Sequence, residues 1–414
     1  MSIITGLFNL LALLYIGRSI QLAVRLVRDR SALRREPLTR EKQRLAEQAA
    51  FFLGVPPAVL VHEGAHALAV ILFGGRVVEF GYRVFWGYVV PGGVFTAVEN
   101  WIIAVAGTIG SLAFGALVWA ALRRHPSRTY QYFGLRTFRF QIYFSLLYYP
   151  VFSLFLPIGD WRTIYDFGAT PLLSTATAVV HVAALLLFWR VDRAGGFEMI
   201  AFESTTAQER YEMTRAAAGA GNPEAELQAV AALWAGGAPQ AARHALGRFL
   251  AAHPDSAEGQ LQLALHESGR QGAVSRNAAQ AAERALALGL RAPDNAALAH
   301  RLIASHYLER GDGHAAEATL NEALSATATY DPARLSPGQQ AELHYLRAQA
   351  YRRQGQYEAA YADATAARNM AVAMGSETTA AKYAAEQQLI MSHAGHDLSG
   401  KGTEPEAVPH TFDP

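Results

Sequence analysis

The sequence contains no cysteine among its 414 residues. Disulfide bonds and thiolate metal ligands are therefore excluded, and cysteine usage gives no information on the redox state of the compartment. Net charge is also nearly absent, because 36 lysines and arginines are balanced by 35 acidic residues. This balance gives no indication of the basic surface that typically binds nucleic acid.

The two halves of the chain differ in composition. Residues before about 192 are rich in Leu, Phe, Val, Tyr and Trp, whereas later residues are rich in Ala, Gln, Glu, Arg and His. The overall hydrophobic share of 51% averages these two unlike halves. The composition therefore predicts a membrane-embedded half followed by a soluble half.

Long apolar runs in the first half predict an all-α, polytopic bundle of transmembrane helices. Such runs have about the length that a helix needs to cross a bilayer. The first run is interpreted as a membrane anchor and not as a signal peptide, because its charge follows the apolar stretch. The five expected spans are Ser2–Val27, Phe51–Phe73, Ala97–Leu122, Gln141–Leu156 and Thr170–Trp189.

Charge and composition also set the expected orientation and domain borders. Two basic loops lie at residues 25–44 and 123–139. If all five segments span, these loops lie on one side, which the positive-inside rule makes cytoplasmic together with the C-terminal half. The charge count alone leaves the orientation open. We expect a multi-pass protein of the plasma (inner) membrane. The expected domains are an anchor helix with a basic loop at 1–44, a membrane core at 45–192, helical repeats at 193–395 and a disordered tail at 396–414.

One apolar run contains an H-E-x-x-H motif, formed by His62, Glu63 and His66. Residues four apart lie on one face of a helix, so both imidazoles can bind one metal ion, of which zinc is the expected one. Glu63 would stand beside the open coordination site, where a carboxylate can take a proton from a water molecule. The alternative is that these polar residues are packed in a helix bundle and have no function in catalysis or metal binding. We disfavour it because ionisable groups are costly in hydrocarbon.

A catalytic zinc site usually has three protein ligands, so one more is needed. Asp160 is the first carboxylate after a hydrophobic span, and its loop lies on the same membrane side as the end of the motif helix. We therefore predict Asp160 as the third ligand, with Asp166 as the second choice. Asp160 could instead cap a turn.

Two further stretches surround the motif. Residues 77–95 alternate short apolar runs with Gly81, Gly87 and the turn Pro91-Gly92-Gly93, which predicts a β-hairpin or short strands. A free strand edge there could pair with an extended substrate, although a plain connecting loop is an equal alternative. Residues 106–111 are rich in small side chains, which let another helix approach closely.

Together these residues resemble the site-2 protease family of intramembrane zinc metalloproteases. The resemblance covers about residues 45–168. It implies that His62, His66 and Asp160 bind zinc, that Glu63 activates water, and that the substrate is a membrane-spanning helix. The chain departs from the family pattern at Thr108, where a proline is common. The segments that carry the resemblance are His62-Glu63-Gly64-Ala65-His66, Phe73-Gly74-Gly75, Phe80-Gly81, Ala106-Gly107-Thr108-Ile109-Gly110-Ser111 and Leu156-Pro157-Ile158-Gly159-Asp160.

The second half is helical by composition and contains an internal repeat. Two anchoring glycines, Gly311 and Gly355, lie 44 residues apart, and a loop around 331–337 accounts for the excess over a period of about 34. This pattern resembles tetratricopeptide repeats, whose concave surface typically binds a peptide or protein. His393, His396 and His410 are interpreted as tail residues and not as a metal site. The first copy contains Tyr307, Gly311, Gly313, Ala316, Leu320 and Ala323. The residues at the corresponding positions of the second copy are Tyr351, Gly355, Tyr357, Ala360, Ala364 and Ala367.

From the sequence we predict an intramembrane zinc metalloendopeptidase with a repeat domain that binds a substrate or regulator. The expected partners are a transmembrane protein substrate, a peptide or protein on the repeats, and the lipid bilayer, without nucleic acid. Two alternatives stay open: a non-proteolytic membrane-anchored scaffold and a metal-handling membrane transporter. Glu63 favours the enzyme, because a site that only binds zinc needs no general base.

Overall fold

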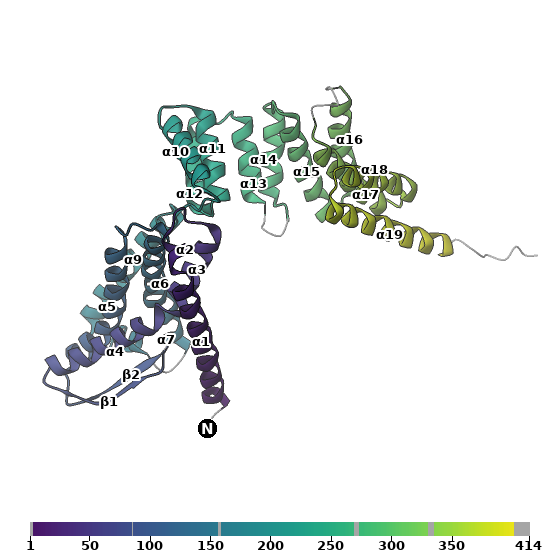
Figure 1. Ribbon diagram of the computed structural model, residues 1–414. Helices are drawn as coiled ribbons and strands as arrows, with labels where there is room; N and C mark the ends of the chain where they lie inside the picture. Colours follow the sequence, from purple (N-terminus) through teal and green to yellow (C-terminus); the bar gives the residue numbers. More distant parts are fainter. Residues whose placement is uncertain (1–2, 85, 156–158, 269–272, 330–334, 401–414) are drawn as a thin grey trace, which may run out of the picture. The chain divides into compact units, whose positions relative to one another are not determined.

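The computed structural model describes residues 3–84, 86–155, 159–268, 273–329 and 335–400 (Figure 1). The chain forms two compact units, residues 1–245 and residues 246–414. Both are built mainly of helices, which confirms the all-α class in its coarse form. The border between the units falls within one helix, α12 (Pro239–Ala252).

The first unit contains the helices that could span a membrane. Within the described residues, four helical segments are long and apolar enough to cross a bilayer: Leu10–Arg28, Arg40–Leu72, Ala97–Leu122 and Pro171–Arg193. Their exposed apolar side chains include Leu13, Leu72 and Leu172. The helices that contain these segments are α1 (Ile3–Arg28), α3 (Arg40–Phe52), α4 (Val55–Leu72), α5 (Ala97–Leu122) and α9 (Pro171–Arg193).

The segment expected as a further span, residues 141–156, is distributed over three consecutive helical elements. These are α6 (Arg128–Tyr143), the π-helix η1 (Phe144–Tyr148) and α7 (Tyr149–Phe155). Arg136 and Arg139 lie in α6, so the apolar run begins only in the last turn of that helix. Within the described residues, residues 141–155 are therefore not among the four segments that are long and apolar enough to cross a membrane.

The break between α3 and α4 follows from two adjacent prolines. Pro56 and Pro57 lack the N–H that would bond to a carbonyl one turn earlier, so α3 and α4 do not form one ladder. The Ser19 hydroxyl of α1 donates to the Phe52 carbonyl at 3.0 Å, at the end of α3. A backbone group that could find no water in a bilayer is thereby satisfied.

Helices α4 and α5 pack through small side chains. Gly110 of α5 lies directly against Val61 and Ala65 of α4. Ala104 and Gly107, on the same face of α5, are also buried. The expectation that the small residues at 106–111 allow close helix approach is confirmed.

A two-stranded antiparallel hairpin follows α4, as the sequence predicts for residues 77–95. Its strands are β1 (Arg76–Tyr82) and β2 (Gly87–Gly92), with a register shift between Val77 and Glu79. Both strands contact α4. In Figure 1 the hairpin lies beside α4 at one end of the bundle.

Residues 193–245 share contacts with the membrane helices of the same unit. Glu198 accepts hydrogen bonds from the backbone N–H groups of Gln240 and Ala241 at 3.0 Å, at the first turn of α12. Gln43 of α3 donates to the carbonyl of Met199. The other helices of the first unit are α2 (Arg30–Arg34), α8 (Asp160–Ile164), α10 (Thr205–Gly219) and α11 (Pro223–Ala235).

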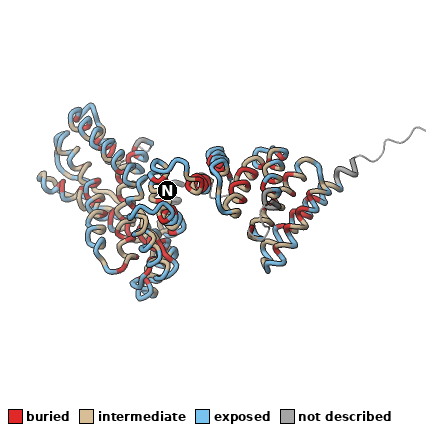
Figure 2. The backbone as a smooth tube through the Cα atoms, turned by 90° about the horizontal axis from the view of Figure 1, so that it is seen from above, coloured by how far each residue is buried: buried red, intermediate tan, exposed pale blue. Residues whose placement is uncertain are grey.

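The second unit consists of consecutive helices with an alanine-rich interior. In Figure 2 its buried residues lie along the helix sides that face one another. The two predicted copies take equivalent places: Tyr307 and Tyr351 each lie two residues before the end of a helix, and Gly311 and Gly355 follow with positive φ. The helices are α13 (Ala257–Glu267), α14 (Arg276–Ala287), α15 (Pro293–Glu309), α16 (Gly313–Thr329), α17 (Pro337–Arg353), α18 (Tyr357–Ala373) and α19 (Glu377–Gly400).

Three expectations fall wholly or partly outside the described residues. Pro157 lies in the gap at 156–158, and most of the expected loop at 331–337 lies in the gap at 330–334, after which α17 begins at Pro337. Of the tail expected at 396–414, residues 401–414 are not described, and the first five residues continue α19.

Candidate metal centre

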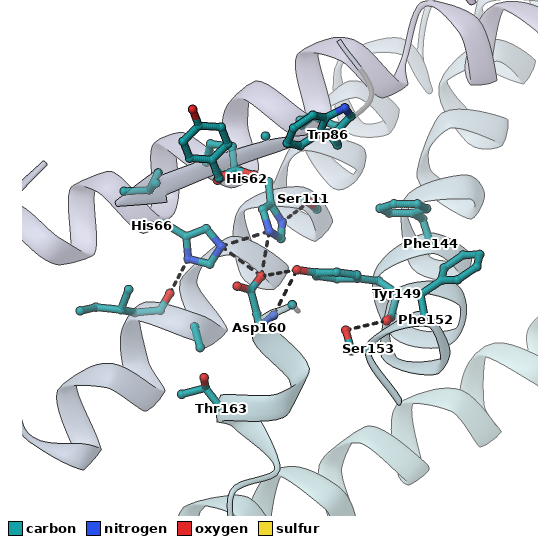
Figure 3. A pocket seen from close by; sticks show the side chains of 18 of the residues that line it. His62, His66, Trp86, Ser111, Phe144, Tyr149, Phe152, Ser153, Asp160 and Thr163 are labelled. Carbon is teal, nitrogen blue, oxygen red and sulfur yellow. Dashed lines mark hydrogen bonds and ion pairs between the residues drawn. The ribbon is translucent and has the colours of Figure 1, made fainter. Parts of the chain in front are cut away.

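Three of the predicted site residues meet at one point in the first unit (Figure 3). His62 Nε2 and His66 Nε2 lie 3.0 and 3.1 Å from Asp160 Oδ2, and 3.1 Å from each other. The two histidines come from consecutive turns of α4, whereas Asp160 is the first residue of α8, about 100 residues later. A helix face and a distant loop therefore converge on one donor set.

The second nitrogen of each imidazole already has a partner. His62 Nδ1 lies 3.1 Å from the Ser111 hydroxyl, and His66 Nδ1 lies 2.6 Å from the Ile103 carbonyl, both on α5. A carbonyl can only accept, so His66 carries its proton on Nδ1 and presents an unprotonated Nε2 to the centre when neutral. Partners of this kind orient metal-binding histidines in general.

Gly107 allows α5 to approach these imidazoles. A Cβ atom at position 107 would lie 2.2 Å from His66 Nε2 and 2.7 Å from His62 Cε1, closer than real Cβ contacts come. The absence of a side chain thus opens the space beside both ligand nitrogens. No other residue type would leave that space.

Asp160 is held by contacts from its own loop. Gly159, which precedes it, has φ +114°, a backbone conformation that favours glycine. The Tyr149 hydroxyl donates to Asp160 Oδ2 at 3.0 Å and accepts from the Asp160 backbone N–H at 3.1 Å.

Glu63 lies one residue beyond His62 and is buried, with 6% of its surface exposed. Its side chain packs over Gly87 at the start of β2, where a Cβ atom would lie 2.5 Å from Glu63 Cγ and 2.9 Å from Glu63 Oε1. Glu63 therefore stands between the motif helix and the hairpin. Of the three motif residues, it alone is absent from the donor set.

The donor set opens into a pocket of about 920 Å³. Strand β2 contributes Gly87, Tyr88 and Val89 to its wall, and Phe144 and Phe152 contribute aromatic rings. The wall is thus apolar over much of its area, with the three donors and Glu63 at one place. Asn100 also lines the pocket and donates to the Phe95 carbonyl at 3.3 Å.

Asp166, the second choice for the third ligand, has a different position. Its Oδ1 accepts hydrogen bonds from the backbone N–H groups of Gly168 and Ala169 at 3.1 and 2.9 Å. This is the turn-capping role that was considered for Asp160. Asp166 lines the pocket but does not join His62 and His66.

The three donors fit a metal ion. Their ligand atoms lie within 4.8 Å of one another, and each is a nitrogen or carboxylate oxygen of the kind that zinc binds. Two histidines and one carboxylate leave a fourth position for water or substrate, as in catalytic zinc sites. The space left by Gly107 lies beside the histidine nitrogens of that set.

Four contributors to this site were not identified as such from the sequence. Ser111 and Gly107 lie in the stretch at 106–111, which was interpreted only as a packing surface, and Gly87 was interpreted only as a break in the hairpin. Their helical or turn positions gave no signal for a role at the metal centre. Tyr149 lies 11 residues before Asp160, and its approach depends on an irregular helix that no local sequence pattern indicated.

No protein-family model matches the chain, and no curated protein matches it. The resemblance to site-2 proteases therefore depends on the motif residues alone.

Proposed function

We propose that this protein is an intramembrane zinc endopeptidase of the site-2 protease kind. The observation that carries the proposal is the meeting of His62, His66 and Asp160, with Glu63 next to them in one pocket among membrane helices. A site that only stores or carries zinc has no use for a buried glutamate beside the donors. Hydrolysis of a peptide bond needs such a glutamate, because a general base must take a proton from the attacking water.

The residues of the site would have separate roles in metal binding, proton transfer and the exclusion of water. His62, His66 and Asp160 would hold zinc, which when bound supplies a Lewis acid that polarises a carbonyl and activates water. Glu63 accepts the proton of the attacking water and can pass it to the leaving amine. The apolar wall, including Phe144 and Phe152, limits the entry of bulk water.

The substrate class follows from the pocket wall. A transmembrane helix hides its carbonyls in hydrogen bonds, so the cleaved stretch must be extended. Strand β2 lines the pocket and pairs with β1 on one side, which leaves its other edge for an extended chain. The substrate would therefore be a membrane-anchored protein with a locally unwound segment. The helices of the second unit would bind the substrate or a regulator.

The test combines metal content with proteolysis. The purified full-length protein should hold about one zinc per chain by elemental analysis, and His66→Ala and Asp160→Ala should lower that content. Single-span model peptides with helix-breaking residues, reconstituted in the same detergent, should be cut by the wild type and not by Glu63→Gln. A folded wild type without zinc would refute the proposal, and zinc flux into vesicles without cleavage would favour the transporter.

A further inference from the structure

We propose that Tyr149 is a positioning residue that fixes the Asp160 carboxylate as a ligand of the metal centre. This inference rests on the proposed zinc site. Tyr149 belongs to α7, outside the motif helix and outside the helix that carries Asp160. Figure 3 shows its ring beside His62, with the hydroxyl directed at Asp160.

The two hydrogen bonds of Tyr149 determine where its proton lies. The hydroxyl oxygen accepts from the Asp160 backbone N–H at 3.1 Å, and that N–H can only donate. The hydroxyl proton is therefore free to point at Asp160 Oδ2, 3.0 Å away. Tyr149 thus links the main chain and the side chain of the same residue, and this restricts the rotation of the carboxylate.

The π-helix η1 gives Tyr149 this orientation. Residues five apart in an α-helix lie about 140° apart around the axis and cannot stack. Across η1, however, Phe144 and Tyr149 stack with ring centres 6.2 Å apart and an angle of 7°, and Tyr143 and Tyr148 stack at 6.0 Å. The wider turn brings residues five apart into line, so that Tyr149 faces Asp160. Such π-turns often occur at functional sites.

The ring of Tyr149 also makes contacts that do not need the hydroxyl. It meets the His62 ring edge to face, with centres 5.8 Å apart, and it lines the pocket. A Tyr149→Phe substitution keeps these contacts and removes only the oxygen. It therefore separates the positioning of Asp160 from general packing.

The experiment measures zinc affinity, by competition with a chromogenic chelator, in the full-length protein in detergent. Groups that orient a metal ligand typically contribute 10- to 100-fold to affinity, so we expect Tyr149→Phe to weaken zinc binding by about that factor. The zinc-free variant should still unfold in one cooperative transition, with its thermal midpoint lowered only by the loss of two hydrogen bonds. Tyr148→Phe is the matched control, because Tyr148 is 48% exposed and stacks on Tyr143 in the same π-turn.

A double substitution tests whether Tyr149 acts through Asp160. In the Asp160→Ala background, Tyr149→Phe should cause no further loss of zinc affinity, because the carboxylate that it positions is gone. An unchanged affinity in Tyr149→Phe, or an equal loss with and without Asp160, would overturn the inference and leave the proposed protease intact. A wild type that binds no zinc would overturn both.

Discussion

Gly107 leaves the space that His62 and His66 would need to bind the proposed zinc ion. We expect Gly107→Ala to abolish zinc binding, because its Cβ would lie 2.2 Å from His66 Nε2. Gly64→Ala is the matched control: Gly64 lies inside the motif on α4, and a Cβ there would meet nothing within 4 Å. Elemental analysis of the two purified variants provides the measurement. Equal zinc content in both would contradict the placement of α5 against the donors.

Gly87 should affect Glu63 without affecting the donors. A Cβ at position 87 would push the Glu63 side chain out of its place over β2. General bases typically increase the reaction rate 10²- to 10⁴-fold. We therefore expect Gly87→Ala to lower the rate of cleavage of the model peptides by a large part of that factor. Zinc content should stay at the wild-type level. Lost zinc would mean that the substitution disturbs the whole centre.

The residues of the site were predictable to different degrees from the sequence. His62, Glu63 and His66 follow from the spacing of one helix face, and Asp160 follows from its place after a hydrophobic run. Gly107 and Gly87 were not predictable as site residues, because each matters through the side chain it lacks. That effect exists only once another element is packed against it.

At the scale of elements, His181 links α9 to the π-turn and to α8. Its Nε2 lies 2.6 Å from the Leu146 carbonyl in η1, and its Nδ1 contacts the Tyr165 hydroxyl at the end of α8. Trp161 packs against its ring at an angle of 33°, with ring centres 4.5 Å apart. These contacts join three elements inside a region where water cannot replace lost hydrogen bonds.

We expect His181→Phe to destabilise the first unit, because it keeps the ring on Trp161 but removes both polar contacts. Hydrogen bonds between membrane helices contribute about 0.6 to 1.7 kcal/mol each. The free energy of unfolding in mixed detergent micelles should fall by about 1 to 3 kcal/mol. Thr177→Val is the control, since the Thr177 hydroxyl bonds only within α9, to Leu173. If His181→Phe lowered the free energy of unfolding no more than Thr177→Val does, α9 would be held by packing alone.

The elements themselves were predictable where the sequence carries strong periodicity or a break. The hairpin after α4 was expected from glycine and proline positions. The π-turn was not, because residues 141–156 read as one apolar run. A single wide turn changes which side chains face inward without changing composition.

At the scale of the molecule, composition changes near residue 192, whereas the compact units meet at residues 245 and 246. The segment between these positions has a soluble composition but is tied to the first unit. Its Glu198 caps the start of α12, and Gln43 reaches the carbonyl of Met199, 156 residues away. Contacts over such separations leave no local signal, so composition alone could not place this border.

The second unit should lose stability in acid. Asp363 is buried between Arg347, whose Nε lies 2.6 Å away, and His344 at 2.8 Å. Burial raises the pKa of Asp363, but hydrogen bonds from Arg347 and His344 lower it below its usual value. The lowered pKa stabilises the fold above the unfolded pKa, and that contribution is lost as the pH falls through the folded pKa.

This acid sensitivity can be measured with one substitution. Hydrogen bonds to charged groups contribute about 1.5 to 3 kcal/mol, so we expect Asp363→Asn to destabilise the second unit by roughly that amount at neutral pH. The difference from wild type should shrink as the pH falls below about 4. Thermal unfolding between pH 3 and 7 provides the measurement, with the exposed Glu358→Gln as the control. A difference that does not depend on pH would exclude the carboxylate as its cause.

Zinc removal should act on the first unit alone, because all three donors lie within residues 1–245. A ligand present at 1,000 times its dissociation constant stabilises the folded state by about 4 kcal/mol, and a chelator removes that contribution. We expect calorimetry in detergent to show one transition that moves to lower temperature with chelator and one that does not. Asp363→Asn should shift only the second transition, and His66→Ala should make the first insensitive to chelator. If chelator moved both transitions equally, the two units would unfold as one, and zinc at the membrane centre would stabilise the helices of the second unit as well.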